Sequence, residues 1–507
     1  MKIRNVLLAA AVVFQTAAVF AQPRKSYPVP VKTPEVQRLL EQRRLWTPSA
    51  REALPQSVDN SVSEHFPAIF SQIGGSCAQS SGIRYMFTYE MNRCLGRKAT
   101  APDNVFSYFY TWNFLNNGMD EGGWSEQGLN IARSTGVMNL ADFPDQTSAY
   151  QFRWQSGYDK YIRAMHYRVD EILSMPVTSE AEIEVVKSYL AQGGVVTYSS
   201  YSSDWKMDNY YDGPSQTGYR SLLTRLATTG AHAMTIAGYD DTVEFTPEGG
   251  EPTTGAFIVV NSWGSYSHDN GRFYLPYYFF LQKYTDGNML SDDVTGITVK
   301  YHEPKIIFKV GLTYTSRNDL AFALGVANKP YAEIPTVKVS TTTVSNQGGD
   351  NNMQGAYEPA DMEIAFDFTD YLSQVEAMSE PKFFLTVTRS NRGKTLGSGR
   401  VTYFSVLDLR DGNAPKEYVC NTLDGSELAL GENVFSVATT PATTTSASEV
   451  KWNDNLYRPY SYPFVFRTAS GKYSKVQFTD YDRKTGKVTL RYLYQGNGTT
   501  DIANVEE

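Results

Sequence analysis

The chain has 507 residues, of which 20% are charged and 41% are hydrophobic, and its formal net charge is −8. A chain of this length predicts about three domains with cores of their own. The acidic balance excludes the basic footprint expected of a nucleic-acid-binding protein, and three cysteines are too few for a disulfide framework.

The first 21 residues have the features of a secretory signal peptide. Lys2 and Arg4 precede an apolar run over residues 6–20, which ends in the small-residue site Val19-Phe20-Ala21. The run is too short to span a membrane, and no later stretch is apolar enough to be a transmembrane segment. We therefore expect an exported protein, located in the periplasm, outside the cell or at the cell surface.

Residues 22–53 carry a single short helix signal. Thr33 is a suitable N-cap, Pro34 fits the first turn, and Val36 and Leu39 lie on one face. Two interpretations are open, a short pro-segment or a strap packed against the following domain.

Residues 54–300 combine helix and strand signals. Helices are predicted over residues 77–93, 102–114, 126–134 and 180–191. Strands are predicted over 194–198 and 257–260, with a hairpin insertion at 242–255. This region is therefore predicted to be one α+β domain.

Three short motifs within this domain carry a thiol, an imidazole and an amide. They are Gly75-Ser76-Cys77-Ala78-Gln79, Gly230-Ala231-His232-Ala233 and Val260-Asn261-Ser262-Trp263-Gly264. A thiol is a good nucleophile only as the thiolate, which a nearby imidazole can generate by accepting its proton. An amide bound to the other ring nitrogen then fixes the tautomer of the imidazole. Taken singly, each residue could be an ordinary core or turn residue, so the prediction depends on all three.

The order and flanks of these motifs resemble the papain family of cysteine peptidases (clan CA, C1-like). The resemblance covers residues 54–300 and implies a two-lobed catalytic domain, with a helical lobe and a β-barrel-like lobe. It implies that Cys77 is the nucleophile, that His232 is the base and acid, and that Asn261 orients the imidazole. Gln72 and the backbone N–H of Cys77 would stabilise the oxyanion.

The same resemblance assigns a set of substrate-binding residues and no metal or other cofactor. Trp124 opposite small residues implies a roomy apolar S2 pocket. The residues assigned to the cleft are Gly122, Gly123, Trp124, Ala231, Ala233 and Trp263.

Three features depart from the family pattern. Gln72 precedes Cys77 by five residues where the family usually has six, so Gln79 is an alternative source of the oxyanion amide. Ala78 follows the nucleophile at a position that is usually tryptophan. No cysteine lies near Cys77 to form the usual cleft disulfide, because Cys94 is on the far part of the same predicted helix, and Cys94 and Cys420 are expected to be free.

Beyond residue 300 the pattern changes to short alternating strands, for example at 364–368, 383–387 and 400–406. Residues 301–435 are therefore predicted to form a β-sandwich, similar to the jelly-roll sandwiches appended to secreted bacterial peptidases. A Thr/Ser/Ala-rich linker over 436–455 and a C-terminal β-hairpin segment over 456–507 follow. These β modules are expected to contact a cell surface, a host protein or a glycan.

Together these features predict a secreted papain-like cysteine endopeptidase that cleaves proteins or peptides through an acyl-enzyme on Cys77. One alternative is a transglutaminase-like acyl transferase, which normally has an aspartate where this chain has Asn261. Another is a non-catalytic adhesion or ligand-binding protein on a papain scaffold. The intact set of Gln72, Cys77, His232 and Asn261 disfavours that alternative.

Overall fold

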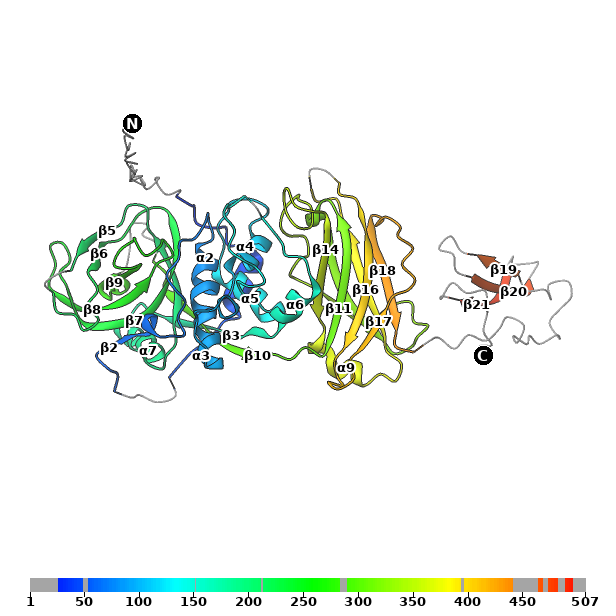
Figure 1. Cartoon of the computed structure of the whole chain (residues 1–507), viewed down its shortest axis with the longest axis horizontal. Coiled ribbons are helices and arrows are strands. Elements are labelled where there is room, and N and C mark those ends of the chain that lie inside the picture. The colour runs from blue at the N-terminus through cyan, green and yellow to red at the C-terminus, as the bar shows by residue number, and fades with distance from the viewer. Residues whose placement is uncertain are drawn as a thin grey trace, which may run out of the picture.

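The computed structural model describes residues 26–48, 53–150, 152–210, 213–282, 290–393 and 396–440, together with strands at 464–467, 473–481 and 488–495. The predicted signal peptide and residues 441–455 of the predicted linker lie outside the described residues. The fold is mixed α+β, as predicted: a large sheet, a group of helices and a β-sandwich lie next to one another (Figure 1).

One long helix forms the centre of the helical lobe. It comprises α2 (Cys77–Gln79), a π-helical segment (Ser80–Phe87) and α3 (Thr88–Leu95), and Gly96 ends it with a left-handed φ of 61°. The helix is buried on all sides from Ala78 to Asn92, since other elements surround it. The other helices of the lobe are α4 (Tyr108–Leu115), α5 (Ser125–Thr135) and α6 (Tyr158–Met165).

The helix predicted over residues 102–114 is shorter in the structure. Only a 3-10 turn forms at Pro102–Asn104, and α4 begins at Tyr108. Phe106 instead pairs with Asn139 in an isolated β-bridge, which holds this part of the chain extended.

The β lobe is built on a ten-stranded sheet. Nine strands follow the order β1-β3-β10-β4-β7-β8-β9-β6-β5, and β2 is the tenth, paired with β7. Helix α7 (Glu180–Ala191) packs against β3 and β7, and the short helix α8 (Tyr278–Leu281) follows β9. The hairpin predicted at 242–255 is an extension of β7 and β8, which stay paired as far as Phe245 and Thr253. The strands are β1 (Arg44–Leu45), β2 (Ser57–Asp59), β3 (Tyr167–Pro176), β4 (Val196–Tyr201), β5 (Lys206–Asn209), β6 (Ser221–Arg225), β7 (Ala231–Phe245), β8 (Thr253–Val260), β9 (Arg272–Pro276) and β10 (Asp293–Tyr301).

A sandwich of two four-stranded antiparallel sheets follows. The sheet orders are β14-β11-β16-β17 and β13-β12-β15-β18, and the short helix α9 (Leu372–Glu376) lies between β14 and β15 in sequence. Phe308 of one sheet meets Phe383 of the other, with ring centroids 5.7 Å apart. The strands are β11 (Ile306–Tyr314), β12 (Leu320–Ala327), β13 (Val337–Ser340), β14 (Asp361–Asp367), β15 (Lys382–Arg389), β16 (Gly399–Asp408), β17 (Lys416–Val419) and β18 (Gly431–Ala438).

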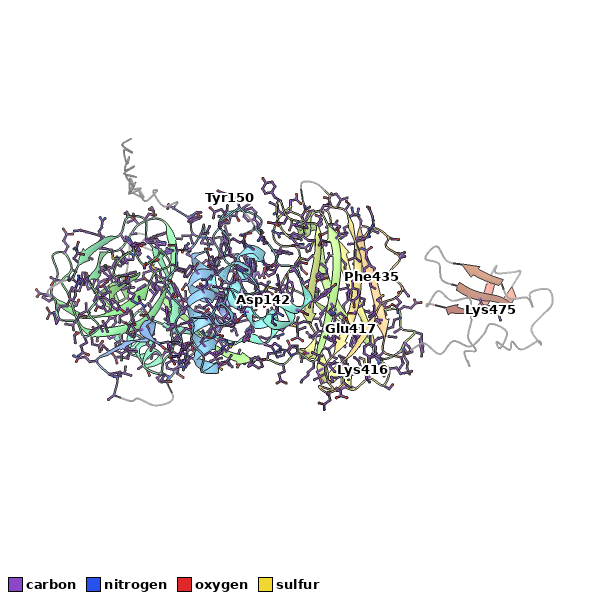
Figure 2. All side chains as sticks on the ribbon, viewed as in Figure 1. Asp142, Tyr150, Lys416, Glu417, Phe435 and Lys475 are labelled. Atoms are coloured by element: carbon purple, nitrogen blue, oxygen red, sulfur yellow. The ribbon has the colours of Figure 1, made fainter. Side chains whose placement is uncertain are left out.

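The sandwich is packed tightly against the helical lobe. One continuous cluster of buried apolar side chains runs through both, and Figure 2 shows side chains filling the space between the lobe, where Asp142 is labelled, and the sandwich, where Phe435 is labelled. Arg317 of the sandwich is fully buried and lies 4.2 Å from the ring of Trp154. Its guanidinium donates to the carbonyl of Phe152 (2.8 Å). These contacts make the helical lobe and the sandwich one packed unit.

The C-terminal segment contains three strands, β19 (Phe464–Arg467), β20 (Tyr473–Tyr481) and β21 (Val488–Gln495), in one antiparallel sheet. The predicted hairpin corresponds to β20 and β21, to which β19 adds an edge strand. Within the described parts of the chain, no helix combines the length and the apolar character needed to cross a membrane.

Candidate active site

Cys77 is the first residue of α2, and a tight loop leads into it. The Gly75 N–H donates to Oδ1 of Asp120 (2.7 Å), and the Ser76 hydroxyl donates to the carbonyl of Ile73 (2.8 Å). A Cβ on Gly75 would lie 2.8 Å from the backbone carbon of Glu121, so only glycine fits there. The loop before Cys77 is thus held against the loop that precedes α5.

His232 lies at the beginning of β7, and Asn261 directly follows β8, the neighbouring strand. His232 Nε2 is 2.9 Å from Asn261 Oδ1, and both residues are buried. Because an amide oxygen can only accept, His232 Nε2 carries the hydrogen. The other ring nitrogen, Nδ1, is therefore the one that can take a proton from a thiol.

Neighbouring side chains hold both partners of this hydrogen bond in place. Trp263 stacks on His232 with ring centroids 4.6 Å apart and an interplanar angle of 19°. On the other side of Asn261, its Nδ2 is 3.0 Å from Nε2 of His268, which fixes the orientation of the amide. His268 adopts a left-handed φ of 57°, and this conformation belongs to the loop between β8 and β9.

The structure distinguishes the two candidate oxyanion amides. Gln79 is buried, donates from Nε2 to the carbonyl of Trp124 (3.0 Å) and accepts from Thr111 at Oε1 (2.9 Å), so its amide is engaged inside the lobe. Gln72 is only partly buried. Its Oε1 accepts from Ser262 (2.6 Å), and its Nε2 donates one hydrogen to the carbonyl of Gly74 (3.0 Å). An amide nitrogen has two hydrogens, so Gln72 has a donor left for the oxyanion.

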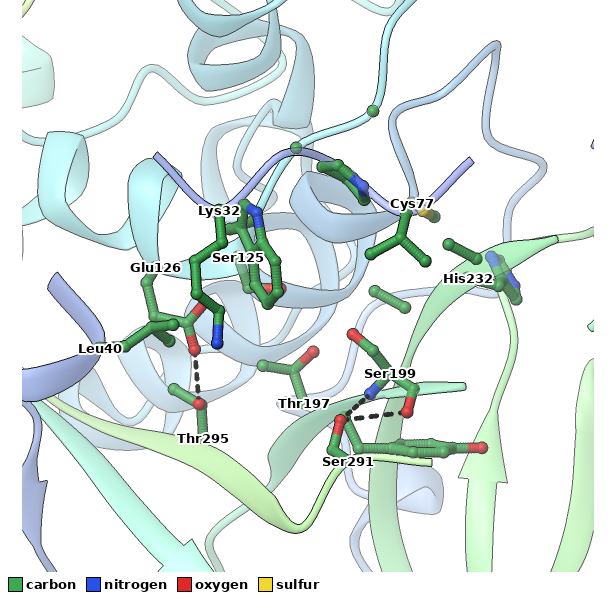
Figure 3. A pocket seen from close by; sticks show the side chains of 18 of the residues that line it. Lys32, Leu40, Cys77, Ser125, Glu126, Thr197, Ser199, His232, Ser291 and Thr295 are labelled. Carbon is green, nitrogen blue, oxygen red and sulfur yellow. Dashed lines mark hydrogen bonds between the residues drawn. The ribbon is translucent and has the colours of Figure 1, made fainter. Parts of the chain in front are cut away.

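Cys77 and His232 line the same cavity, which has a volume of about 580 Å³. Figure 3 shows the two side chains next to each other at one end of it. Burial raises the pKa of the Cys77 thiol, and the backbone groups of Ala233, Ala78 and Cys77 itself act in the opposite direction. In the covered state that the structure describes, the sulfur is therefore biased toward the neutral thiol.

The N-terminal strap, defined as residues 26–48, covers the cavity. Its helix α1 (Pro34–Glu41) is capped by Thr33. The carbonyl of Tyr27 accepts the N–H of Ala231 (2.9 Å), and the Tyr27 hydroxyl donates to Asp120 (2.9 Å). Residues 27–30 belong to the cavity wall together with Cys77, so the strap lies against the space next to the thiol.

The residues assigned to the cleft by sequence are brought together with one exception. Gly122, Gly123, Trp124, Ala231 and Ala233 line the cavity with Cys77. Trp263 is not among its lining residues and packs on His232 instead.

The far end of the cavity is charged, and the sequence-based prediction of an apolar pocket did not extend to it. This end, called the acidic end below, is formed by Glu126, Asp293 and Thr295 with Arg43 of the strap. In Figure 3, Glu126 and Thr295 lie at the opposite end from Cys77 and His232. That prediction considered only the cavity walls near Cys77.

Two other residues of the site were not predicted. Asp120 binds both the loop before Cys77 and the strap, and its position two residues before Gly122 was the sequence feature that could have indicated it. His268 supports Asn261, and a histidine in the loop between two predicted strands was the corresponding clue. Among the described residues, no three His, Cys, Asp or Glu side chains gather in a way that could hold a metal ion. Cys77, Cys94 and Cys420 are all free, as expected for the last two.

Comparisons with solved structures found cysteine proteases. The chain is similar to xylellain, a cysteine protease from Xylella fastidiosa, at 19% identity and a TM-score of 0.37, over 55% of this chain and 98% of that one. It is also similar to digestive procathepsin L 3 of Tenebrio molitor larval midgut (15%, TM-score 0.36, 51% and 74%). A third similar structure is the bromelain protease from Ananas comosus in complex with the E64 inhibitor (17%, TM-score 0.31, 48% and 99%). No protein-family model and no curated protein matches the chain.

Proposed function

We propose that this chain is a secreted papain-like cysteine endopeptidase. The observation that carries the proposal is the arrangement around His232, whose Nε2–H is held by Asn261 at 2.9 Å while its ring lies beside Cys77 in one cavity. This arrangement leaves Nδ1 as the proton acceptor for the thiol. A buried and oriented base next to a nucleophile at a helix start is the requirement for thiol catalysis.

In the proposed reaction, His232 Nδ1 takes the Cys77 proton, and the sulfur attacks the carbonyl carbon of the scissile peptide bond. The oxyanion accepts hydrogen bonds from the backbone N–H of Cys77 and from the remaining amide hydrogen of Gln72. The C–N bond then breaks, and the imidazolium gives its proton to the leaving amine. Water attacks the thioester with His232 as base, the C–S bond breaks, and the thiol is restored.

In this proposal the strap restricts access to the thiol, because Tyr27–Pro30 form part of the cavity wall beside Cys77. Tyr27→Ala removes the hydroxyl that holds Asp120 and is expected to raise the initial rate of peptide hydrolysis. Tyr266→Ala is a matched control, because Tyr266 is fully exposed. Equal rates for the two variants would mean that the strap does not limit access.

The direct test is hydrolysis of a labelled protein such as casein by three versions of the full chain. Wild type and Cys94→Ala are expected to cleave it, since Cys94 is an exposed thiol at the far end of the same helix. Cys77→Ala is expected to be inactive with an unchanged melting temperature, because the substitution is small. Turnover by Cys77→Ala would refute the proposal.

The signal-peptide pattern of residues 1–21 supports an exported location, periplasmic or extracellular. Fractionation of cells that produce the full chain tests this, and recovery of uncleaved protein from the cytoplasm alone would contradict it. The β-sandwich and the C-terminal sheet are proposed to contact a cell surface, a host protein or a glycan. Deletion of residues 441–507 is then expected to reduce surface retention while casein hydrolysis persists, and unaltered retention would count against this role of the C-terminal sheet.

A further inference from the structure

The acidic end of the cavity contains a buried carboxylate that faces a guanidinium of the strap. Glu126 is in the first turn of α5, and its side chain is only 7% exposed. Its Oε1 accepts from the Thr295 hydroxyl (2.7 Å) and lies 3.6 Å from Nη1 of Arg43. The Arg43 side chain is itself only 9% exposed, so the pair is shielded from water.

A second carboxylate, that of Asp293, also binds this guanidinium. Asp293 Oδ2 accepts from Arg43 Nη2 (2.5 Å) and from the hydroxyl of Ser174 (2.8 Å). Arg43 Nη1 donates to Thr295 Oγ1 (2.8 Å). Two acids and a hydroxyl, contributed by α5 and β10, thus form a socket around one planar cation.

The socket opens into the cavity that contains the nucleophile. Glu126, Asp293 and Thr295 line the same cavity as Cys77 and His232, and Thr197 and Ser199 lie between the two ends (Figure 3). A peptide held at Cys77 would therefore have a side chain within reach of the socket.

Displacement of the strap changes the charge balance of the socket. Arg43 belongs to the strap that covers Cys77 and directly precedes β1, so displacement of the strap as far as Arg43 withdraws the guanidinium from the socket. Glu126 would then be a buried carboxylate without its cation, which is costly. A neutral or apolar substrate side chain cannot compensate for this loss, whereas a cationic one can.

We propose that the acidic end is a specificity pocket for a basic side chain of the substrate, arginine above all, and that Arg43 occupies it in the covered enzyme. The proposal rests on the proposed function, because it names the substrate class of that site. Arginine fits better than lysine, because its planar fork can pair with a carboxylate and a hydroxyl at the same time.

The test uses the full chain and does not require catalysis. In Cys77→Ala/Arg43→Ala protein the socket is vacated, and N-acetylarginine amide is titrated by calorimetry against N-acetylcitrulline amide, which has the same shape without the charge. The arginine compound is expected to bind about tenfold or more tightly, the effect of hydrogen bonds to a charged group. The added Glu126→Gln substitution should abolish this difference, and Glu121→Gln should keep it, since Glu121 is exposed and lies outside the cavity lining.

Equal binding of the two compounds, or a preference that survives Glu126→Gln, would overturn the proposal. Asp293→Asn is the second variant should Glu126→Gln fail to fold, and it is expected to weaken the preference in the same direction. In the active chain, peptides with arginine are expected to have a kcat/KM about tenfold or more above those with citrulline at one position. Failure to hydrolyse any peptide would refute the proposed function, while the binding result would still decide the pocket.

Discussion

Glu90 provides a quantitative test of how the two lobes are joined. It lies on α3 with only 2% of its side chain exposed. Its Oε1 accepts the N–H of Val195, which precedes β4 in the other lobe (3.1 Å), and its Oε2 accepts from Arg93 (2.7 Å). Burial raises the pKa of this carboxyl to about 7 from its usual 4.5, although Arg93 and the Val195 N–H act in the opposite direction.

The sign and size of the effect on stability follow from this pKa. Between pH 4.5 and about 7 the folded chain holds a proton at Glu90 that the unfolded chain has lost, so the free energy of unfolding falls as the pH rises through this window. One pKa unit corresponds to about 1.4 kcal/mol, and the full fall is therefore about 3 kcal/mol. Glu90→Gln keeps the oxygen for Val195 and cannot ionise, so it should not show this fall.

The assay is urea unfolding in the Cys77→Ala background, which prevents self-digestion. Tryptophan fluorescence is a suitable signal, because six of the seven tryptophans lie between residues 26 and 300. The stability of Glu90→Gln relative to the parent is expected to increase by about 3 kcal/mol from pH 4.5 to 8. Glu64→Gln is the control and should show no such trend, since the exposed Lys98 pair keeps the Glu64 pKa below its usual value. A flat difference for Glu90→Gln as well would refute the reasoning.

Three further substitutions test the site and the domain interface. Gln72→Ala should lower the acylation rate by roughly 10²-fold, as expected for one oxyanion donor. Alkylation of the thiol by iodoacetamide should stay nearly unchanged. Equal losses of rate in both reactions would show that Gln72 only supports the loop before Cys77. Asn261→Ala should lower kcat without abolishing it, because His232 keeps its ring but loses its orientation, and an unchanged kcat would mean that another group holds the ring. The carboxylate of Asp367 forms a buried ion pair with Arg168 and also binds His302 (2.6 Å). Asp367→Asn breaks the pair with Arg168 and should destabilise the chain by about 3 kcal/mol. Burial alone would raise the pKa of Asp367, but His302, Arg168 and Thr369 bring it below its usual value. The difference in the free energy of unfolding between wild type and variant should therefore shrink only at strongly acidic pH. An unaltered urea midpoint at neutral pH would contradict this role.

The parts of the site that follow from local sequence were predictable. Gly75 before Cys77 and the apolar run before Asn261 are short-range signals, because turn geometry and strand periodicity depend on neighbours in the chain. The fold class followed from the same signals. The change from helix to alternating strands past residue 300 predicted a separate β region.

The remaining features depend on contacts between distant segments. The sequence favoured Gln72 for the oxyanion amide but left Gln79 open, because the difference is which of them faces the inside of the lobe. The acidic end was missed for a similar reason: Arg43, Glu126 and Asp293 lie in three separate segments, and only the folding of β10 beside α5 brings them together.

Direct detection of the acyl-enzyme tests the central claim most closely. A slowly deacylating ester is mixed with the full chain, the reaction is quenched with acid, and the adduct is located by peptide mass mapping. We predict one acyl group per chain on Cys77, formed at the rate of the burst of alcohol release, and none in Cys77→Ala or His232→Ala. An acyl group on another residue, or turnover without any adduct, would contradict thiol catalysis at Cys77.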